Sequence, residues 1–159
     1  MARNDVEMGA ELLNVQDVFS LIKDLGAIDR SKAVRDGLRR GAGTFVIAGR
    51  RKLRKRMKAG AKGFTGNLTG SFIVRVKRDN RGALAGFRRT HNASENQGWH
   101  SHLVDQGTTQ RSTKKGKNRG SMPANFFWTD TRNQEGRNAI DTVMRGIEAA
   151  CERIRARRN

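Results

Sequence analysis

In the first third of the chain, hydrophobic residues recur every three or four positions, the spacing of an amphipathic helix. One run predicts a short helix over about residues 15–25 and consists of Val15, Val18, Phe19, Ile22 and Leu25. A longer run predicts a second helix, which is capped by Asp29 or Ser31 and ends near Lys58. Its apolar stripe consists of Val34, Leu38, Ala42, Phe45, Gly49, Leu53 and Met57. Residues 1–14, which include Met8, Leu12 and Leu13, are interpreted as an arm or a short edge strand.

The spacing changes to alternation after a glycine-rich turn. Gly66 and Gly70 supply the backbone freedom for a reversal, and Leu68 is the only large apolar residue between Phe64 and Phe72. Apolar and polar residues then alternate, which predicts a strand over about residues 70–78. A turn at 79–82 and a returning strand over 83–88 complete a hairpin. Residues 99–105 return to strand character and predict a third strand.

The last third of the chain contains a loop and a helix. Residues 109–121 hold no apolar side chain and predict a mobile basic loop. Thr131 and Gln134 have the spacing of a capping box and predict the start of a final helix. Its apolar face consists of Ile140, Val143, Met144, Ile147, Cys151 and Ile154. Residues 1–159 are thus expected to form a single α+β domain, with an antiparallel sheet packed against the long basic helix and the C-terminal helix.

Charge is the dominant feature of the composition. The 159 residues include 33 Lys and Arg against 15 Asp and Glu, a net charge of +18, while only 35% are hydrophobic. This balance predicts a thin core and an anionic partner, which could be nucleic acid, an acidic protein surface or anionic lipid. A solvated helix face is the alternative for the cations of the long helix. The candidate partner- or DNA-contacting residues are Arg50, Arg51, Arg54, Lys55, Lys58, Arg111, Lys114, Lys115, Lys117 and Arg119.

The residues that carry catalysis and metal binding are scarce. A single cysteine, Cys151, excludes an internal disulfide, and its helical spacing predicts a core position. His100 and His102 would share one face of the predicted strand near Asp105, but a third metal ligand is lacking. Acidic residues in the middle of the chain show no paired arrangement. We therefore expect no metal, no cofactor and no enzymatic activity.

The sequence also lacks targeting signals and the motifs by which proteins recognise nucleic acids. No apolar run approaches the roughly 20 residues that a membrane span needs, and the residues after Met1 lack the apolar core of a signal peptide. We therefore expect a protein made and kept in a cytoplasm, or in something assembled there. The chain has no tyrosine and no zinc-finger spacing. If it binds DNA, it should do so through phosphates and without sequence preference.

Three short motifs, in this order, carry a resemblance to a known family. The first is a turn after the basic helix, the second ends the predicted strand at 99–105, and the third precedes the last helix. Their matching residues are Thr65, Gly66, Leu68 and Ser71, then Val104, Gly107 and Thr108, and then Pro123. Over roughly residues 12–155 the chain resembles the tail-component or neck-protein family of long-tailed bacteriophages, named for the tenth gene product of a lambdoid phage. Asp105 stands where that family has glutamate, and the phenylalanine of the third motif is displaced to Phe126.

The resemblance implies a structural virion protein of the neck, at the head–tail junction, that acts in tail completion. Such proteins form homo-oligomeric rings around the DNA channel, between the connector or adaptor and the tail terminator or tail tube. The protein would then be assembled in the host cytoplasm, reside in the virion, contact no membrane and lie close to packaged DNA. The motifs have the character of fold determinants, and each alone would also suit an ordinary glycine turn, strand end or core cluster. A sequence-independent nucleic-acid-binding protein remains the alternative.

Overall fold

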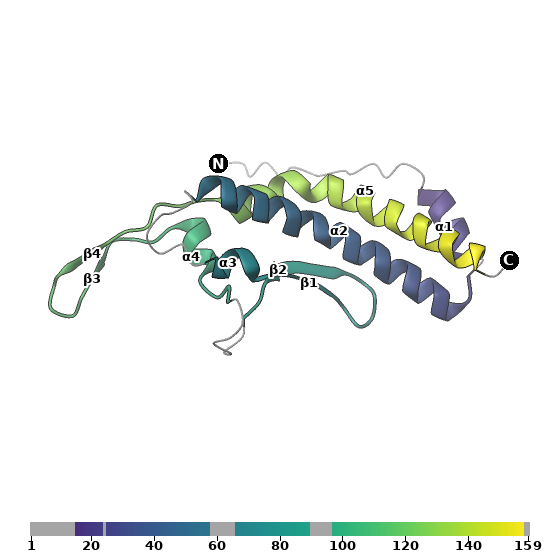
Figure 1. Cartoon of the computed structure of the whole chain (residues 1–159), viewed down its shortest axis with the longest axis horizontal. Coiled ribbons are helices and arrows are strands. Elements are labelled where there is room, and N and C mark those ends of the chain that lie inside the picture. Colours follow the sequence, from purple (N-terminus) through teal and green to yellow (C-terminus); the bar gives the residue numbers. More distant parts are fainter. Residues whose placement is uncertain (1–14, 24, 58–65, 90–96, 158–159) are drawn as a thin grey trace, which may run out of the picture.

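The computed structural model describes residues 15–23, 25–57, 66–89 and 97–157 (Figure 1). Two helices of 30 residues each, α2 (Ala27–Arg56) and α5 (Phe127–Ala156), lie side by side and run in opposite directions. A short helix, α1 (Val15–Lys23), packs on them, and a hairpin of β1 (Phe72–Val76) and β2 (Ala83–Phe87) lies against α2. The smaller elements are α3 (Asn67–Gly70), α4 (Ser101–Gln106), β3 (Arg111–Ser112) and β4 (Asn118–Gly120). The predicted α+β class is confirmed.

Small residues bring α2 and α5 into close contact. A side-chain carbon added at Gly37 would lie 2.4 Å from Cγ1 of Ile147, and one added at Gly41 would lie 2.2 Å from Cγ2 of Val143. Gly146 faces the backbone of Gly37 in the same way. The face of α2 that packs on α5 is therefore centred on its glycines, between the positions of the predicted stripe. Glycine allows two backbones to approach where a larger side chain would hold them apart.

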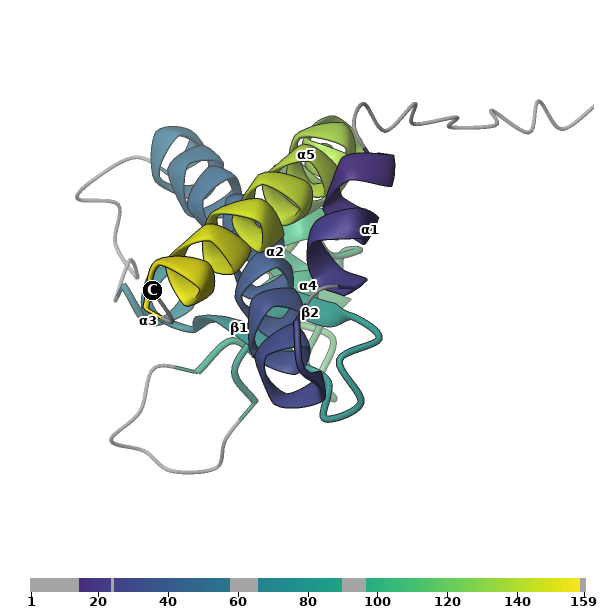
Figure 2. The ribbon, with the colours of Figure 1, turned by 90° about the vertical axis from the view of Figure 1, so that its right-hand side faces the viewer.

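The core consists of two clusters at opposite ends of the long helices. At one end, α1 contributes Val18 to a cluster with Ala33, Ile147 and Cys151. Figure 2 shows α1 beside the C-terminal part of α5. The predicted first helix and the core position of Cys151 are confirmed, although α1 ends at Lys23 and Leu25 packs after the helix end. The second cluster joins Leu53, Leu68, Phe72 and Phe127.

The sheet differs from the prediction in its number of strands. β1 and β2 pair in antiparallel register with Val74 opposite Ala85, which confirms the hairpin. The third strand predicted over 99–105 is wrong, because residues 101–106 form α4. The amides of Leu103 and Val104 both donate to the carbonyl of His100, which closes a helical turn. An alternation this short does not distinguish a strand from one helical turn.

Both predicted helix caps are wrong. α2 begins after Gly26, whose carbonyl accepts the amide of Arg30, so Asp29 and Ser31 already lie inside the helix. α5 begins at Phe127, and Thr131 is a buried residue within it whose hydroxyl donates to the carbonyl of Phe127. The capping box therefore does not form. A residue from another segment of the chain caps α5 instead.

The basic segment 109–121 has more structure than predicted. It contains β3 and β4, which pair as a short antiparallel hairpin that the sequence did not predict. Its side chains are nevertheless exposed throughout both strands, as their composition indicated. The predicted arm or edge strand over 1–14 lies outside the described residues, as do Lys58 and Thr65.

Candidate functional site

Residues of the first two motifs meet at one aromatic cluster. Leu68 of the first motif and Phe72 pack with Phe127, and Val104 of the second motif packs against the same group. The rings of Phe72 and Phe127 lie 6.2 Å apart at a steep angle, a favourable edge-to-face arrangement. The cluster thus ties together segments that are distant in sequence. It determines where the basic segment after α4 leaves the body of the molecule.

The first motif forms the turn into β1. Gly66 has a φ of 75°, the left-handed conformation that glycine adopts without strain. Leu68 is buried, and the hydroxyl of the fully buried Ser71 donates to the carbonyl of Leu68 at 2.8 Å. Arg50 of α2 donates to the carbonyl of Thr69 at 3.1 Å. The turn is therefore fixed both by its core residue and by the long helix.

The second motif supplies the missing cap of α5. Asp105 is only 6% exposed, and its Oδ1 accepts the amide of Trp128 at 2.7 Å. Its Oδ2 accepts the hydroxyl of Thr129 at 2.6 Å. The carboxylate thus satisfies donors that the start of a helix leaves unpaired, and its charge is favourable beside the positive end of the helix dipole. Asp105 is a positioning residue, a role that its sequence motif alone did not indicate.

The residues after Asp105 hold the base of the basic hairpin. Gly107 has a φ of 76°, and a side chain there would collide with the backbone of Met122 and Ala124 at 2.7 Å. The amide of Thr108 donates to the carbonyl of Met122, and the amide of Met122 donates to the hydroxyl of Thr108, both at 2.9 Å. These two bonds join the strands of the segment where it leaves the body. Pro123 of the third motif follows directly and is exposed.

The hairpin itself is a cationic projection, which we call the basic arm (residues 111–120). It extends away from the two long helices at the end of the molecule where α5 begins (Figure 1). No acidic residue occurs between Asp105 and Asp130. Its five cations are all exposed and are Arg111, Lys114, Lys115, Lys117 and Arg119. The arm therefore presents dense positive charge on a support that buries none of these side chains.

The candidate cations of α2 divide into two groups. Arg51, Arg54 and Lys55 are exposed near the end of the helix, which lies at the same end of the molecule as the basic arm (Figure 1). Arg50 instead bonds to the turn at Thr69 and lies over the ring of Phe72, 5.7 Å from its centre. Its contacts are those of a residue that holds the fold together. The structure thus brings the arm and the first group to one end, which we call the cationic end.

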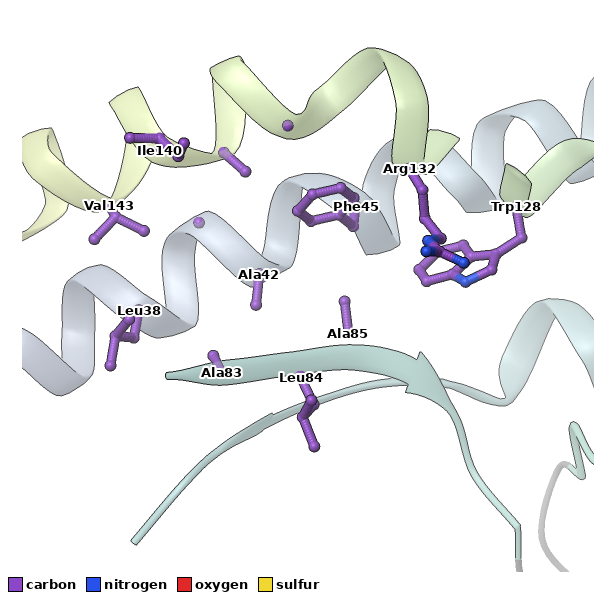
Figure 3. Close-up of a pocket in the computed structure, with 13 residues that line it drawn as sticks. Leu38, Ala42, Phe45, Ala83, Leu84, Ala85, Trp128, Arg132, Ile140 and Val143 are labelled. Carbon is purple, nitrogen blue, oxygen red and sulfur yellow. The ribbon is translucent and has the colours of Figure 1, made fainter. Parts of the chain in front are cut away.

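A second surface feature is an apolar groove between α2, β2 and α5, with a volume of about 640 Å³ (Figure 3). Leu38 and Phe45 line it from α2, and Ile140 lines it from α5. Ala83 and Ala85 point into it from β2, whereas Leu84 points away (Figure 3). Its one charged lining residue is Arg132, which lies beside Trp128. Sequence analysis missed this groove, because its residues come from three separate segments.

His100 and His102 are arranged differently from the prediction. His100 is the N-cap residue of α4 and His102 lies within the helix, where residues two apart point in different directions. His102 contacts the carbonyl of Trp99 through Nδ1 at 3.1 Å. Within the described ranges, no group of three or more His, Cys, Asp or Glu side chains is placed to hold a metal ion. The prediction that His100 and His102 share one face of a strand is therefore wrong.

Two further observations concern the helices. Among the described residues, no helix combines the length and apolar character needed to cross a membrane. Cys151 is fully buried on the inner face of α5, and burial raises the pKa of its thiol. A raised thiol pKa lowers the fraction of reactive thiolate at neutral pH. This is the environment of a packing residue.

Comparison of the chain with protein-family models, with curated proteins and with solved structures finds no match.

Proposed function

We propose that this protein is a structural component of a phage virion, located in the neck at the head–tail junction, where it takes part in tail completion. The proposal rests on the resemblance of the three motifs to the neck-protein family. It is supported by the packing of Leu68 of the first motif and Val104 of the second against the same aromatic cluster. In this proposal the motif residues are fold determinants and carry no catalytic role.

The basic arm is the structural observation that best supports the proposal. Its residues are exposed, so it contributes little burial to the subunit that bears it. Its base is nevertheless held firmly by Gly107, Thr108 and Met122. A fixed projection of this kind is suited to contact another molecule. A homo-oligomeric ring, with the arm and the cationic end against neighbouring subunits, the connector or adaptor, the tail terminator or tail tube, or the enclosed DNA, would use it in this way.

A gene deletion tests this function. The gene is removed from the phage genome that carries it, and the lysate is imaged by electron microscopy. We expect filled or leaking heads separate from finished tails, and joined infectious particles when the full chain is supplied from a plasmid. Joined, infectious particles without the gene would overturn the proposal.

Charge reversal then tests the arm. Complementation with Lys114→Glu, Lys115→Glu and Lys117→Glu together should fail, because repulsion replaces attraction at an anionic partner. The matched control reverses three exposed cations outside the arm and the cationic end, Arg35, Arg39 and Arg137. We expect this control to restore joined particles. Equal restoration by both triple variants would show that the arm is not the contacting surface.

A sequence-independent nucleic-acid-binding function is the second candidate. The observation that favours it is the run of 24 residues between Asp105 and Asp130 that contains the arm and has no carboxylate. Binding through phosphates loses affinity steeply with salt, with a slope of about −0.9 per neutralised phosphate on a double-logarithmic plot. Titration of duplex DNA at several salt concentrations measures this slope. If the arm binds DNA, the triple lysine variant should reduce the slope by roughly one for each phosphate that it no longer neutralises.

A further inference from the structure

β2 has a free edge beside the apolar groove. The amide of Lys77 donates to the carbonyl of Gly82, which fixes the alternation of hydrogen bonds along the hairpin. In this alternation the backbone groups of Ala83 and Ala85 point away from β1. Neither residue makes a backbone hydrogen bond to another segment within the described part of the chain. An unpaired strand edge of this kind is a ready template for a further strand.

The groove continues from this edge toward α5. The side chains of Ala83 and Ala85 point into it, and Ile140 of α5 lines its other side (Figure 3). In an antiparallel pair, residues directly opposite each other place their side chains on the same face of the sheet. The residues of an added strand that lay opposite Ala83 and Ala85 would therefore enter the groove. From Trp128 to Val143 the groove follows 15 residues of α5, or about 22 Å, which is the length of about seven residues of extended chain.

One end of the groove carries a positive charge. Arg132 is the only charged side chain among the described residues that line it, and it lies beside Trp128 (Figure 3). The guanidinium is exposed and forms no ion pair or hydrogen bond with another described residue. A guanidinium can donate two parallel hydrogen bonds to one carboxylate, which is among the strongest contacts it makes. A ligand of the groove should therefore carry a carboxylate at this end.

The described strands of a second copy do not fit the groove. α2 packs on both β1 and β2, so pairing of β2 with the hairpin of another copy would bring a second α2 against the groove, where α5 already lies. β3 and β4 are exposed, but they carry Arg111 and Arg119 and have no apolar side chain. Their charges would also repel Arg132. The groove therefore fits an extended segment that carries apolar side chains and has no helix packed on it.

We propose that the free edge of β2 and the apolar groove bind an extended segment of another protein, which pairs with β2 as a third strand. Alternate residues of this segment are apolar and enter the groove opposite Ala83 and Ala85. An Asp or Glu of the segment contacts Arg132 at the end of the groove beside Trp128. In complexes of this kind, main-chain hydrogen bonds supply affinity, and the pockets for alternate side chains supply specificity. No residue of the basic arm lines this site.

Amide hydrogen exchange measured by NMR tests whether the edge is free. We expect the amides of Ala83 and Ala85 to exchange rapidly in the purified full chain. The amides of Leu84 and Gly86 bond to β1 and are the internal control, since they should be protected. Protected amides at Ala83 and Ala85 in the purified chain would assign the edge to a segment of the same chain or to a second copy. Either assignment would overturn the proposal.

Selection from a peptide library then tests the chemistry of the partner. The probe is a yeast-displayed library of random segments of about nine residues, slightly longer than the groove, and the target is the purified full chain. We expect the selected segments to have apolar residues at alternate positions and an acidic residue near one end. As a synthetic peptide, such a segment should slow exchange at Ala83 and Ala85 by about tenfold or more. Selected segments without this pattern, or no selected segment, would contradict the proposal.

A charge exchange tests the contact with Arg132. Arg132→Glu should weaken binding of the selected peptide by about tenfold or more, because repulsion replaces a charge-assisted hydrogen bond. The same peptide with Lys in place of its acidic residue should bind Arg132→Glu more tightly than the original peptide does. Arg137→Glu reverses an exposed cation of α5 outside the groove and is the matched control, with nearly unchanged binding of the original peptide. Equal weakening by both variants would show that the peptide responds to net charge alone and does not occupy the groove.

Discussion

Asp105 and Thr129 close the start of α5 across 24 positions of sequence. Oδ2 of Asp105 accepts the hydroxyl of Thr129 at 2.6 Å, and Oδ1 accepts the amides of Trp128 and Thr129 at 2.7 and 3.2 Å. The carbonyl of the same residue accepts the amide of Phe126 at 2.8 Å. One residue therefore joins the end of α4 to the start of α5. The basic arm lies between these two ends of the chain.

Replacement of this carboxylate should weaken the whole molecule. We expect Asp105→Ala to lower the free energy of unfolding by about 2 kcal/mol, since removal of a cap costs roughly 0.5–2 kcal/mol and buried amides lose their acceptor. Asp105→Asn keeps one acceptor oxygen and should cost about half as much. Urea unfolding followed by circular dichroism measures both. As a control, Glu148→Ala removes an exposed carboxylate of α5 and should change stability by less than about 0.5 kcal/mol. Equal effects at both positions would contradict the capping role.

Two glycines of α2 should respond to replacement by alanine with changes in stability of opposite sign. Gly37→Ala should destabilise the protein by roughly 1–3 kcal/mol, because the added carbon would lie 2.4 Å from Ile147 and 2.7 Å from the carbonyl of Val143. Gly43→Ala, on the same helix, meets no atom within 4 Å and should stabilise it by about 0.5–1 kcal/mol. Thermal unfolding of the two variants side by side provides the measurement. If both shift the melting temperature in the same direction, the close contact of α2 with α5 is not as described.

Removal of the basic arm should leave the fold intact. Deleting residues 110–120 should change the melting temperature by only a few degrees, because the exposed side chains of the arm contribute little to stability. The same deletion should abolish complementation in the phage assay described above. Differential scanning calorimetry measures the first effect. A loss of more than about 2 kcal/mol would show that the arm packs against the body.

Cys151 should react slowly with thiol reagents. Because burial raises the pKa of its thiol, the folded protein holds mainly the protonated form at pH 8, and the side chain is also inaccessible. We expect modification by an aromatic disulfide to be roughly 100-fold slower in the native protein than in urea. Similar rates in both conditions would contradict a core position.

The same raised pKa sets the direction of a pH dependence. Below the thiol pKa of the unfolded chain, about 8.5, both states are protonated, and the stability contribution is fully present. As the pH rises further, the unfolded chain releases its proton first, and this contribution is lost toward the folded pKa. Unfolding free energies at pH 7 and 9.5 should therefore fall more for the natural chain than for Cys151→Ala. An equal fall in both would show that the thiol has the same pKa in the two states.

The sequence by itself determined the elements whose pattern is long or strictly local. The two long helices have many turns of apolar spacing, and the β1–β2 hairpin has clear alternation around a four-residue turn. Burial of Leu68 followed from its being the only large apolar residue of its turn, and burial of Cys151 from its place on the apolar face of the last helix. Exposure of residues 111–120 followed from their lack of any apolar side chain. In each case, the information lies within a few neighbouring residues.

Tertiary structure decided the features that depend on partners distant in the sequence. Whether residues 101–106 form a strand or a helical turn depended on packing, because the pattern is too short to choose. The start of α5 was set by Asp105 and not by the local capping box at Thr131. The buried carboxylate of Asp105, from another segment, accepts the amides of Trp128 and Thr129, which precede Thr131 in the chain. Close approach at Gly37 and the free edge of β2 likewise exist only once α5 and β1 are in place. A local pattern records which residues must be buried, but the identity of the surface that buries them is fixed by the whole fold.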